Sequence, residues 1–143
     1  MGTGPGMRDV AAVQDAFNRL AADTPTDLSG LYADEVVFVD PAHRVEGRAA
    51  LEAYFDRLNR NVRELRFVFD GTIGDGDEVA LPWTMHLTLK RPRKSIVLPG
   101  MTHLRFDQAG LVVWHRDHFD LGAMVYEQVP VLGWMVKAIR RAL

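Results

Sequence analysis

Apolar residues recur at helical spacing in two segments of the chain. The first segment starts after Asp9, a candidate N-cap, ends before Thr24-Pro25, and carries its apolar face at Val10, Val13, Phe17 and Leu20. The second follows Gly47 and carries its apolar face at Leu51, Tyr54, Phe55 and Leu58. We therefore expect two amphipathic helices, with a short helical turn over 27–32 between them.

The spacing of apolar residues changes to every second position after Asn61, which is typical of half-buried strands. Turn and loop residues at 74–77, 90–94 and 107–110 divide this region, and a β-branched, aromatic run precedes Asp40-Pro41. The expected strands are 36–39, 65–69, 79–89, 96–106 and 112–120. Pro82 and Pro99 each remove a ladder donor, so bulges or edge positions are expected there. The element order predicts an α+β domain with helices packed on one face of a curved antiparallel sheet.

The last predicted strand, 112–120, carries more ionisable side chains than a core strand normally tolerates. Side chains alternate along a strand, so Val113, His115, Asp117 and Phe119 share one face, and Trp114, Arg116, His118 and Asp120 share the other. One of these mixed faces must be buried against the sheet's helices. A buried carboxylate beside a histidine is costly unless it has partners, so such a pair is a candidate functional site.

The sequence predicts one folded domain flanked by two terminal segments. The segment 1–7 is expected to be a flexible tail, 8–121 a single α+β domain, and 122–143 an amphipathic helical extension. The extension's apolar positions are Val131, Leu132, Met135, Val136 and Ile139, and its cations are Lys137, Arg140 and Arg141. We expect it to cap the domain or to pack at a dimer interface. With Trp134 it also resembles a helix that lies on a membrane surface, and it could cover a cavity mouth.

Composition limits the possible partners and compartments. The chain has 143 residues, 48% of them hydrophobic and 25% charged, with a net charge of -2, which gives no indication of nucleic-acid binding. It has no cysteine, which suits a reducing compartment, and its first residues lack the pattern of a signal peptide. The cytoplasm is the default expectation.

Three stretches of sequence resemble a known family. The stretches 31–41 and 45–55, together with 102–110 and the strand after it, are similar to SnoaL-like and ketosteroid-isomerase-like members of the nuclear transport factor 2 superfamily. The resemblance covers roughly Val10 to Phe119. It implies a cone-shaped roll, of the cystatin-like type, with helices on the concave side of the sheet around one apolar cavity. The superfamily includes isomerases, cyclases, dehydratases, epoxide hydrolases and proteins that only bind, so the fold alone does not name a reaction.

The resemblance places Asp40 where ketosteroid isomerases hold their general base. Those enzymes also need a tyrosine on the first helix and an aspartate on the third strand as oxyanion donors, and here Phe17 and Thr102 stand at the two positions. Losing one oxyanion donor typically costs about a hundredfold in rate, so steroid isomerisation by that mechanism is not expected. A plainer role for Asp40 is a turn residue before Pro41.

SnoaL-type cyclases carry an acid/base aspartate on the part of the sheet that corresponds to Asp117. By the same resemblance, His115, Asp117 and Phe119 face the cavity. The other cavity-lining residues would be Phe17, Tyr54, Phe55, Trp83, Met85 and Thr102. The resemblance also implies a homodimer.

The leading hypothesis is a small enzyme without a cofactor, in which Asp40, Asp117 and His115 carry out acid/base chemistry on an apolar metabolite that bears a carbonyl or an epoxide. The alternatives are a binder of an apolar small molecule or lipid and a dimeric interaction module. His115 and Asp117 could instead be a structural hydrogen-bonded pair. They could also ligate a metal, but two groups on one face are too few, and His86, His103 and His118 are not required by the sequence to converge on them. We therefore expect no metal.

Overall fold

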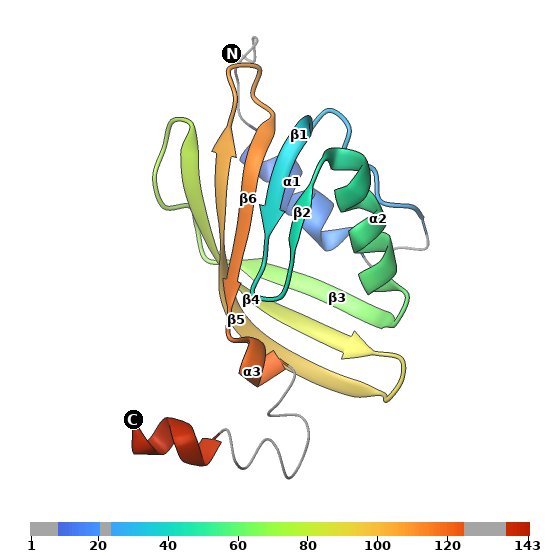
Figure 1. Cartoon of the computed structure of the whole chain (residues 1–143), viewed down its shortest axis with the longest axis vertical. Coiled ribbons are helices and arrows are strands. Elements are labelled where there is room, and N and C mark those ends of the chain that lie inside the picture. Colours follow the sequence, from blue (N-terminus) through green and yellow to red (C-terminus); the bar gives the residue numbers. More distant parts are fainter. Residues whose placement is uncertain (1–8, 21–23, 125–136) are drawn as a thin grey trace.

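A computed structural model describes residues 9–20, 24–124 and 137–143. Its centre is one six-stranded sheet (Figure 1). The strand order across the sheet is β2-β1-β6-β5-β4-β3. The strands are β1 (Tyr32–Val39), β2 (Arg44–Glu46), β3 (Val62–Phe69), β4 (Glu78–Leu89), β5 (Lys94–Phe106) and β6 (Val112–Phe119). The helices are α1 (Val10–Asn18), α2 (Arg48–Asn59) and the short α3 (Leu121–Met124). The α+β class and the curved sheet predicted from the sequence are confirmed, and the sheet is unclosed.

One strand pair differs from the predicted antiparallel sheet. Strands β3, β4, β5 and β6 form antiparallel neighbours along the chain, and β1 pairs with β2 in the same sense. β1 and β6, however, run parallel, so the sheet is mixed. The parallel pair arises because α2 and the long β3–β6 meander separate these two strands in the sequence, which lets β6 return beside β1 in the same direction.

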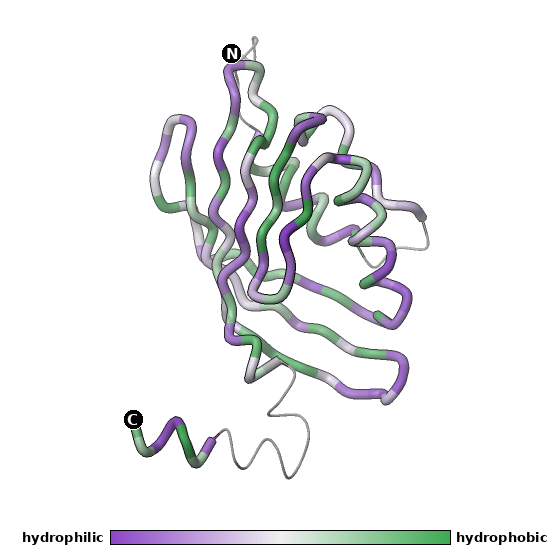
Figure 2. The backbone as a smooth tube through the Cα atoms, viewed as in Figure 1, coloured by the Kyte–Doolittle hydropathy of each residue, from purple (hydrophilic) through white to green (hydrophobic). Residues whose placement is uncertain are grey.

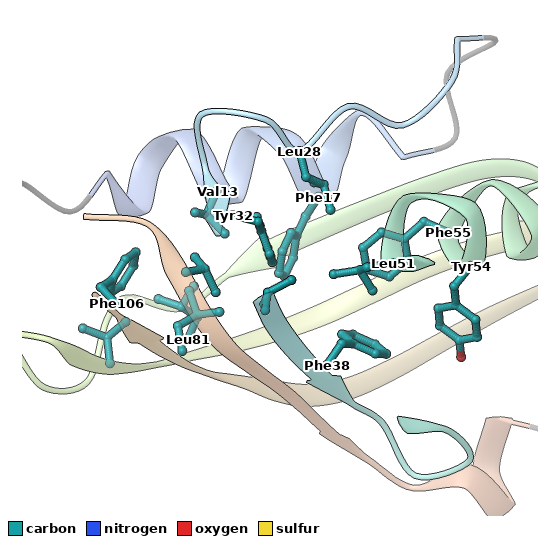
Figure 3. Close-up of a cluster of buried hydrophobic side chains, with 14 residues drawn as sticks. Val13, Phe17, Leu28, Tyr32, Phe38, Leu51, Tyr54, Phe55, Leu81 and Phe106 are labelled. Atoms are coloured by element: carbon teal, nitrogen blue, oxygen red, sulfur yellow. The ribbon is translucent and has the colours of Figure 1, made fainter. Parts of the chain in front are cut away.

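The helices and the concave face of the sheet enclose the main core. Val13 and Phe17 from α1 and Leu51, Tyr54 and Phe55 from α2 pack against strand residues in one buried cluster (Figure 3). Hydrophobic and hydrophilic residues alternate along the strands, as a sheet with one covered face requires (Figure 2). Asp9 caps α1 as predicted, because its Oδ1 accepts a hydrogen bond from the Ala12 N–H at 2.9 Å.

Several local predictions were wrong in detail. Leu58, expected on the buried face of α2, is 49% exposed because it lies in the last turn of the helix. Pro82 and Pro99 form no bulge in the β4–β5 ladder. Each lies one residue beyond the end of the ladder on its other side, which agrees with the edge position that the sequence allowed. The short strand β2 was not predicted, because three residues are too few to show a period.

Parts of the predicted terminal segments lie outside the described residues. These are the N-terminal tail 1–7 and the part of the helical extension that contains Trp134 and Met135. The described end of the extension is helical over 137–142, and Arg140 lies 3.8 Å from the Asp120 carboxylate. None of the described helices has the length and apolar character needed to cross a membrane.

Candidate functional site

A small pocket opens where the parallel strands β1 and β6 separate. Their ladder ends at the pair Val39–Arg116, and beyond it β1 turns away at Asp40-Pro41 while β6 continues beside β5. The pocket has a volume of about 210 Å³ and is lined by Asp40, Pro41, Arg116, Asp117, His118 and Phe119. The two carboxylates singled out from the sequence therefore lie on one pocket. They come from strand ends that are far apart in the chain.

Asp117 is held from inside the protein by His115. The His115 Nε2 atom lies 2.8 Å from Asp117 Oδ1, and its Nδ1 atom lies 2.7 Å from the Tyr32 hydroxyl. The imidazole is 1% exposed and packs against Phe17 and Phe38, with ring centroids 5.3 and 4.8 Å away. His115 is thus enclosed by the core and reaches the pocket only through Asp117.

The hydrogen-bond partners of His115 determine its tautomer. A carboxylate oxygen accepts hydrogen bonds, so the Nε2–H group of the imidazole donates to Asp117 Oδ1. Nδ1 then accepts from the Tyr32 hydroxyl, which has no other hydrogen-bond partner among the described residues. Burial, with a smaller contribution from the charge of Asp117, raises the pKa of Tyr32 well above its ordinary value, so Tyr32 remains a donor. The Tyr32 hydroxyl and both ring nitrogens of His115 therefore have partners.

A second set of contacts reaches the same oxygen of Asp117 from the other side. The Thr102 hydroxyl donates to Asp117 Oδ1 at 2.6 Å, and the Trp83 indole N–H donates to Thr102 Oγ1 at 2.8 Å. Thr102 is fully buried and Trp83 is 3% exposed. Asp117 Oδ1 therefore accepts two hydrogen bonds. No hydrogen bond joins Oδ2 to any residue that the structure describes, and the Asp117 side chain is 20% exposed.

Asp40 is bound differently, mainly by its own turn. Its Oδ1 accepts from the backbone N–H groups of Ala42 and His43, at 2.8 and 2.7 Å, and its Oδ2 accepts from the Tyr54 hydroxyl at 2.5 Å. The His43 Nδ1 atom lies 3.1 Å from the same hydroxyl. Burial, followed by the hydrogen bond to Asp40, raises the pKa of Tyr54, so this hydroxyl also stays protonated. Both oxygens of Asp40 are engaged, and the turn role considered from the sequence is present.

The remaining residues predicted to line a cavity lie in two buried clusters. Phe17, Tyr54 and Phe55 belong to the core under the helices. Trp83 and Met85 belong to a second cluster between β3, β4 and β5, against which Phe119 packs. Among these predicted lining residues, Phe119 also borders the pocket between β1 and β6.

Sequence reasoning missed Tyr32. It was assigned to a helical turn, whereas it begins β1 and its hydroxyl fixes His115 from 83 positions away. Nothing in the local pattern marks that pairing, because it depends on β1 and β6 lying side by side. Within the described ranges, no group of three or more His, Asp or Glu side chains is placed to hold a metal ion.

Comparison with protein families gives a match over most of the chain. The model of the SnoaL-like domain matches residues 13–115. The chain belongs to the SnoaL-like family. The matched region contains most of α1, all of β1 and α2, and most of the sheet, and it ends at His115.

Solved structures agree with this fold. An NTF2-like protein of unknown function from Burkholderia pseudomallei is 22% identical, with a TM-score of 0.68 over 80% of this chain and 92% of that chain. A candidate SnoaL-like polyketide cyclase from Jannaschia sp. CCS1 is 19% identical, with a TM-score of 0.70 over 80% and 87%. TerC, co-crystallised with polyporic acid, is 17% identical, with a TM-score of 0.67 over 80% and 93%. At these identities the likeness concerns the fold. No curated protein sequence matches this SnoaL-like chain.

Proposed function

We propose that this SnoaL-like protein is an enzyme that works without a cofactor and uses Asp117 to transfer protons on a small organic molecule bound between β1 and β6. One observation carries the proposal. Asp117 Oδ1 accepts hydrogen bonds from His115 and Thr102, while Oδ2, on a side chain that borders the pocket, has no partner among the described residues. A carboxylate held at one oxygen and open at the other is suited to take and return a proton.

The pocket supports a reaction at one small group or ring. Its volume of about 210 Å³ lies below the usual range for sites that enclose a drug-sized ligand, roughly 300–1,000 Å³. A compact molecule would fit inside, as would one ring of a larger molecule. Fold neighbours include a candidate polyketide cyclase, which supports a carbonyl-bearing substrate. TerC, which has a similar fold, was co-crystallised with polyporic acid, and this supports a small organic molecule as the ligand.

For a carbonyl substrate, the chemistry balances with Asp117 alone as proton carrier. Oδ2 removes a proton from the carbon next to the carbonyl, the C–H electron pair moves into the new C=C bond, and the carbonyl oxygen takes the negative charge. The enolate then attacks a second carbonyl carbon within the molecule to form a C–C bond, or, where a C=C bond is conjugated with it, the dienolate is reprotonated at its γ-carbon. Asp117 returns its proton to the resulting alkoxide or carbon. The buried His115 keeps Oδ1 in place and does not itself touch the substrate.

Asp40 supplies the second carboxylate of the pocket. Its three hydrogen bonds hold it in position, so its charge influences the bound molecule from a fixed place. For an epoxide substrate, one carboxylate would accept a proton from the attacking water while the other, protonated, would donate to the opening ring oxygen. That version requires Asp40 to act as a second proton carrier.

The test is a search for carbon-acid exchange. The full-length protein is incubated in D₂O with a panel of small cyclic ketones, diketones and epoxides, and deuterium uptake or product formation is followed by NMR and mass spectrometry. The variant is Asp117→Asn, and the control is Asp34→Asn, whose side chain is 83% exposed. We expect at least one compound to react, with the rate lowered about 100-fold or more in Asp117→Asn and unchanged in the control. Equal rates in wild type and Asp117→Asn would overturn the proposal.

A second candidate function is binding without catalysis. It is favoured by the full engagement of both Asp40 oxygens, which leaves only one open carboxylate oxygen on the pocket. Compounds from the same panel that shift the amide resonances of Asp117 and Phe119 without reacting would support this candidate.

A further inference from the structure

The contacts from Trp83 to Asp117 form a directed arm of hydrogen bonds. An indole N–H can only donate, so Thr102 Oγ1 must accept from Trp83. The hydroxyl has a single proton, and Asp117 Oδ1 lies 2.6 Å from Thr102 Oγ1. Trp83 thereby sets the direction of the Thr102 hydroxyl, which then donates to Asp117.

This arm mirrors the one that runs through His115. There, the Tyr32 hydroxyl donates to Nδ1 and sets the tautomer, and Nε2–H donates to Asp117. Both arms start with a buried group that has a hydrogen to donate, and both end on Oδ1. Two donors on one oxygen leave no favourable place there for a third hydrogen, so an added proton goes to Oδ2.

We infer that Trp83 and Thr102 are positioning residues for Asp117: they hold Oδ1 as an acceptor, so that protonation takes place on Oδ2 at the pocket. The inference rests on the proposed role of Asp117, which it deepens by naming the groups that determine where and how readily Asp117 is protonated. Thr102, at the position that corresponds to the oxyanion-donor aspartate of ketosteroid isomerases, therefore acts in this chain as a hydrogen-bond donor to Asp117.

Gly100 leaves the space that the Trp83 ring needs in order to donate its hydrogen bond to Thr102. A Cβ at this position would overlap the Trp83 ring at Cη2 and would lie 2.8 Å from the His118 carbonyl oxygen. Glycine at this position leaves room for the indole to pack against β5. The indole is thus confined between its cluster and the backbone of β5, with its N–H at Thr102.

The test follows the protonation of Asp117 directly. Full-length protein labelled with ¹³C-aspartate is titrated by NMR, and the Asp117 carboxyl signal is assigned with Asp117→Asn. Thr102→Val removes the hydroxyl while keeping the shape, Thr102→Ser restores a hydroxyl, and Trp83→Phe removes the indole donor together with part of the ring volume. Thr88→Val is the matched control, since Thr88 lies on neighbouring β4 and its hydroxyl contacts Ser95 at 3.2 Å.

We expect Thr102→Val to move the Asp117 titration midpoint to higher pH by about one unit, because the ionised form loses a hydrogen bond. Trp83→Phe should move it in the same direction by less, and Thr102→Ser and Thr88→Val should leave it near the wild-type value. An unchanged midpoint in Thr102→Val, or the same shift in Thr88→Val, would overturn the inference. These outcomes do not depend on turnover, so loss of the proposed function in the deuterium assay would be seen separately.

Discussion

Two clusters, each of one aspartate, one histidine and one tyrosine, meet the same pocket through their aspartates, and their hydrogen bonds follow a different order. In the buried cluster, His115 stands between Tyr32 and Asp117. In the cluster at the pocket rim, Tyr54 stands between Asp40 and the exposed His43. The first links residues from two strands across the sheet. The second links a turn to the helix that follows it.

The difference separates a group that can react from a group that is fixed. Both carboxylate oxygens of Asp40 accept hydrogen bonds, from its own turn and from Tyr54. In Asp117, Oδ1 accepts hydrogen bonds and Oδ2 has no partner among the described residues. Two aspartates that look equivalent in sequence therefore receive different roles from their surroundings. Both aspartates line the pocket, and they differ in how many of their carboxylate oxygens accept hydrogen bonds.

The largest expected contrast lies between the two histidines. His115→Ala should lower the free energy of unfolding by about 3 kcal/mol, because it leaves a cavity and removes a partner from both Tyr32 and Asp117. His43→Ala should lower it by about 0.5 kcal/mol or less, since that side chain is 57% exposed. Urea unfolding followed by circular dichroism measures both values. Equal losses would show that the two clusters do not differ in burial as described.

Gly100 provides a way to disturb one cluster alone. Gly100→Ala should cost about 2 kcal/mol, because the new methyl group meets the Trp83 ring and the His118 carbonyl. In a Trp83→Leu background the same change should cost less, with the backbone contact still contributing. The NMR signals of Asp117 should shift while those of Asp40 stay in place, and matching shifts at both aspartates would contradict the separation of the clusters.

Alkaline pH should affect both clusters in the same sense. Tyr32 and Tyr54 have raised pKa values when folded, so above about pH 10 an unfolded tyrosine loses its proton while the buried one keeps it. The unfolded state then binds fewer protons, and the free energy of unfolding falls as the pH rises, by up to about 1.4 kcal/mol per unit for a buried tyrosine such as Tyr32. Tyr32→Phe should flatten this decline between pH 10 and 11. A decline as steep as that of the wild type would contradict the buried environment of Tyr32.

The sequence predicted the repeating parts of this molecule well. Helices α1 and α2 and the long strands follow periodic patterns, and the alternation along β6 correctly predicted that His115 and Asp117 share one face. The role of Tyr32 was not predictable in this way, because it depends on a parallel pairing of β1 with β6 that no local pattern encodes. The hydrogen bond from Tyr54 to Asp40 likewise depends on how α2 places Tyr54 over the turn, whereas the two bonds from the turn amides are local.

The central claim is that Asp117, and not Asp40, carries the proton. The most direct measurement compares the deuterium exchange rate of a reactive compound from the panel in Asp117→Asn and Asp40→Asn, with melting temperatures recorded for both. Asp117→Asn should lower the rate about 100-fold or more, and Asp40→Asn should lower it clearly less, since the carbonyl oxygen of the introduced asparagine can still accept from the turn amides. A greater loss in Asp40→Asn, with both variants folded, would contradict the assignment.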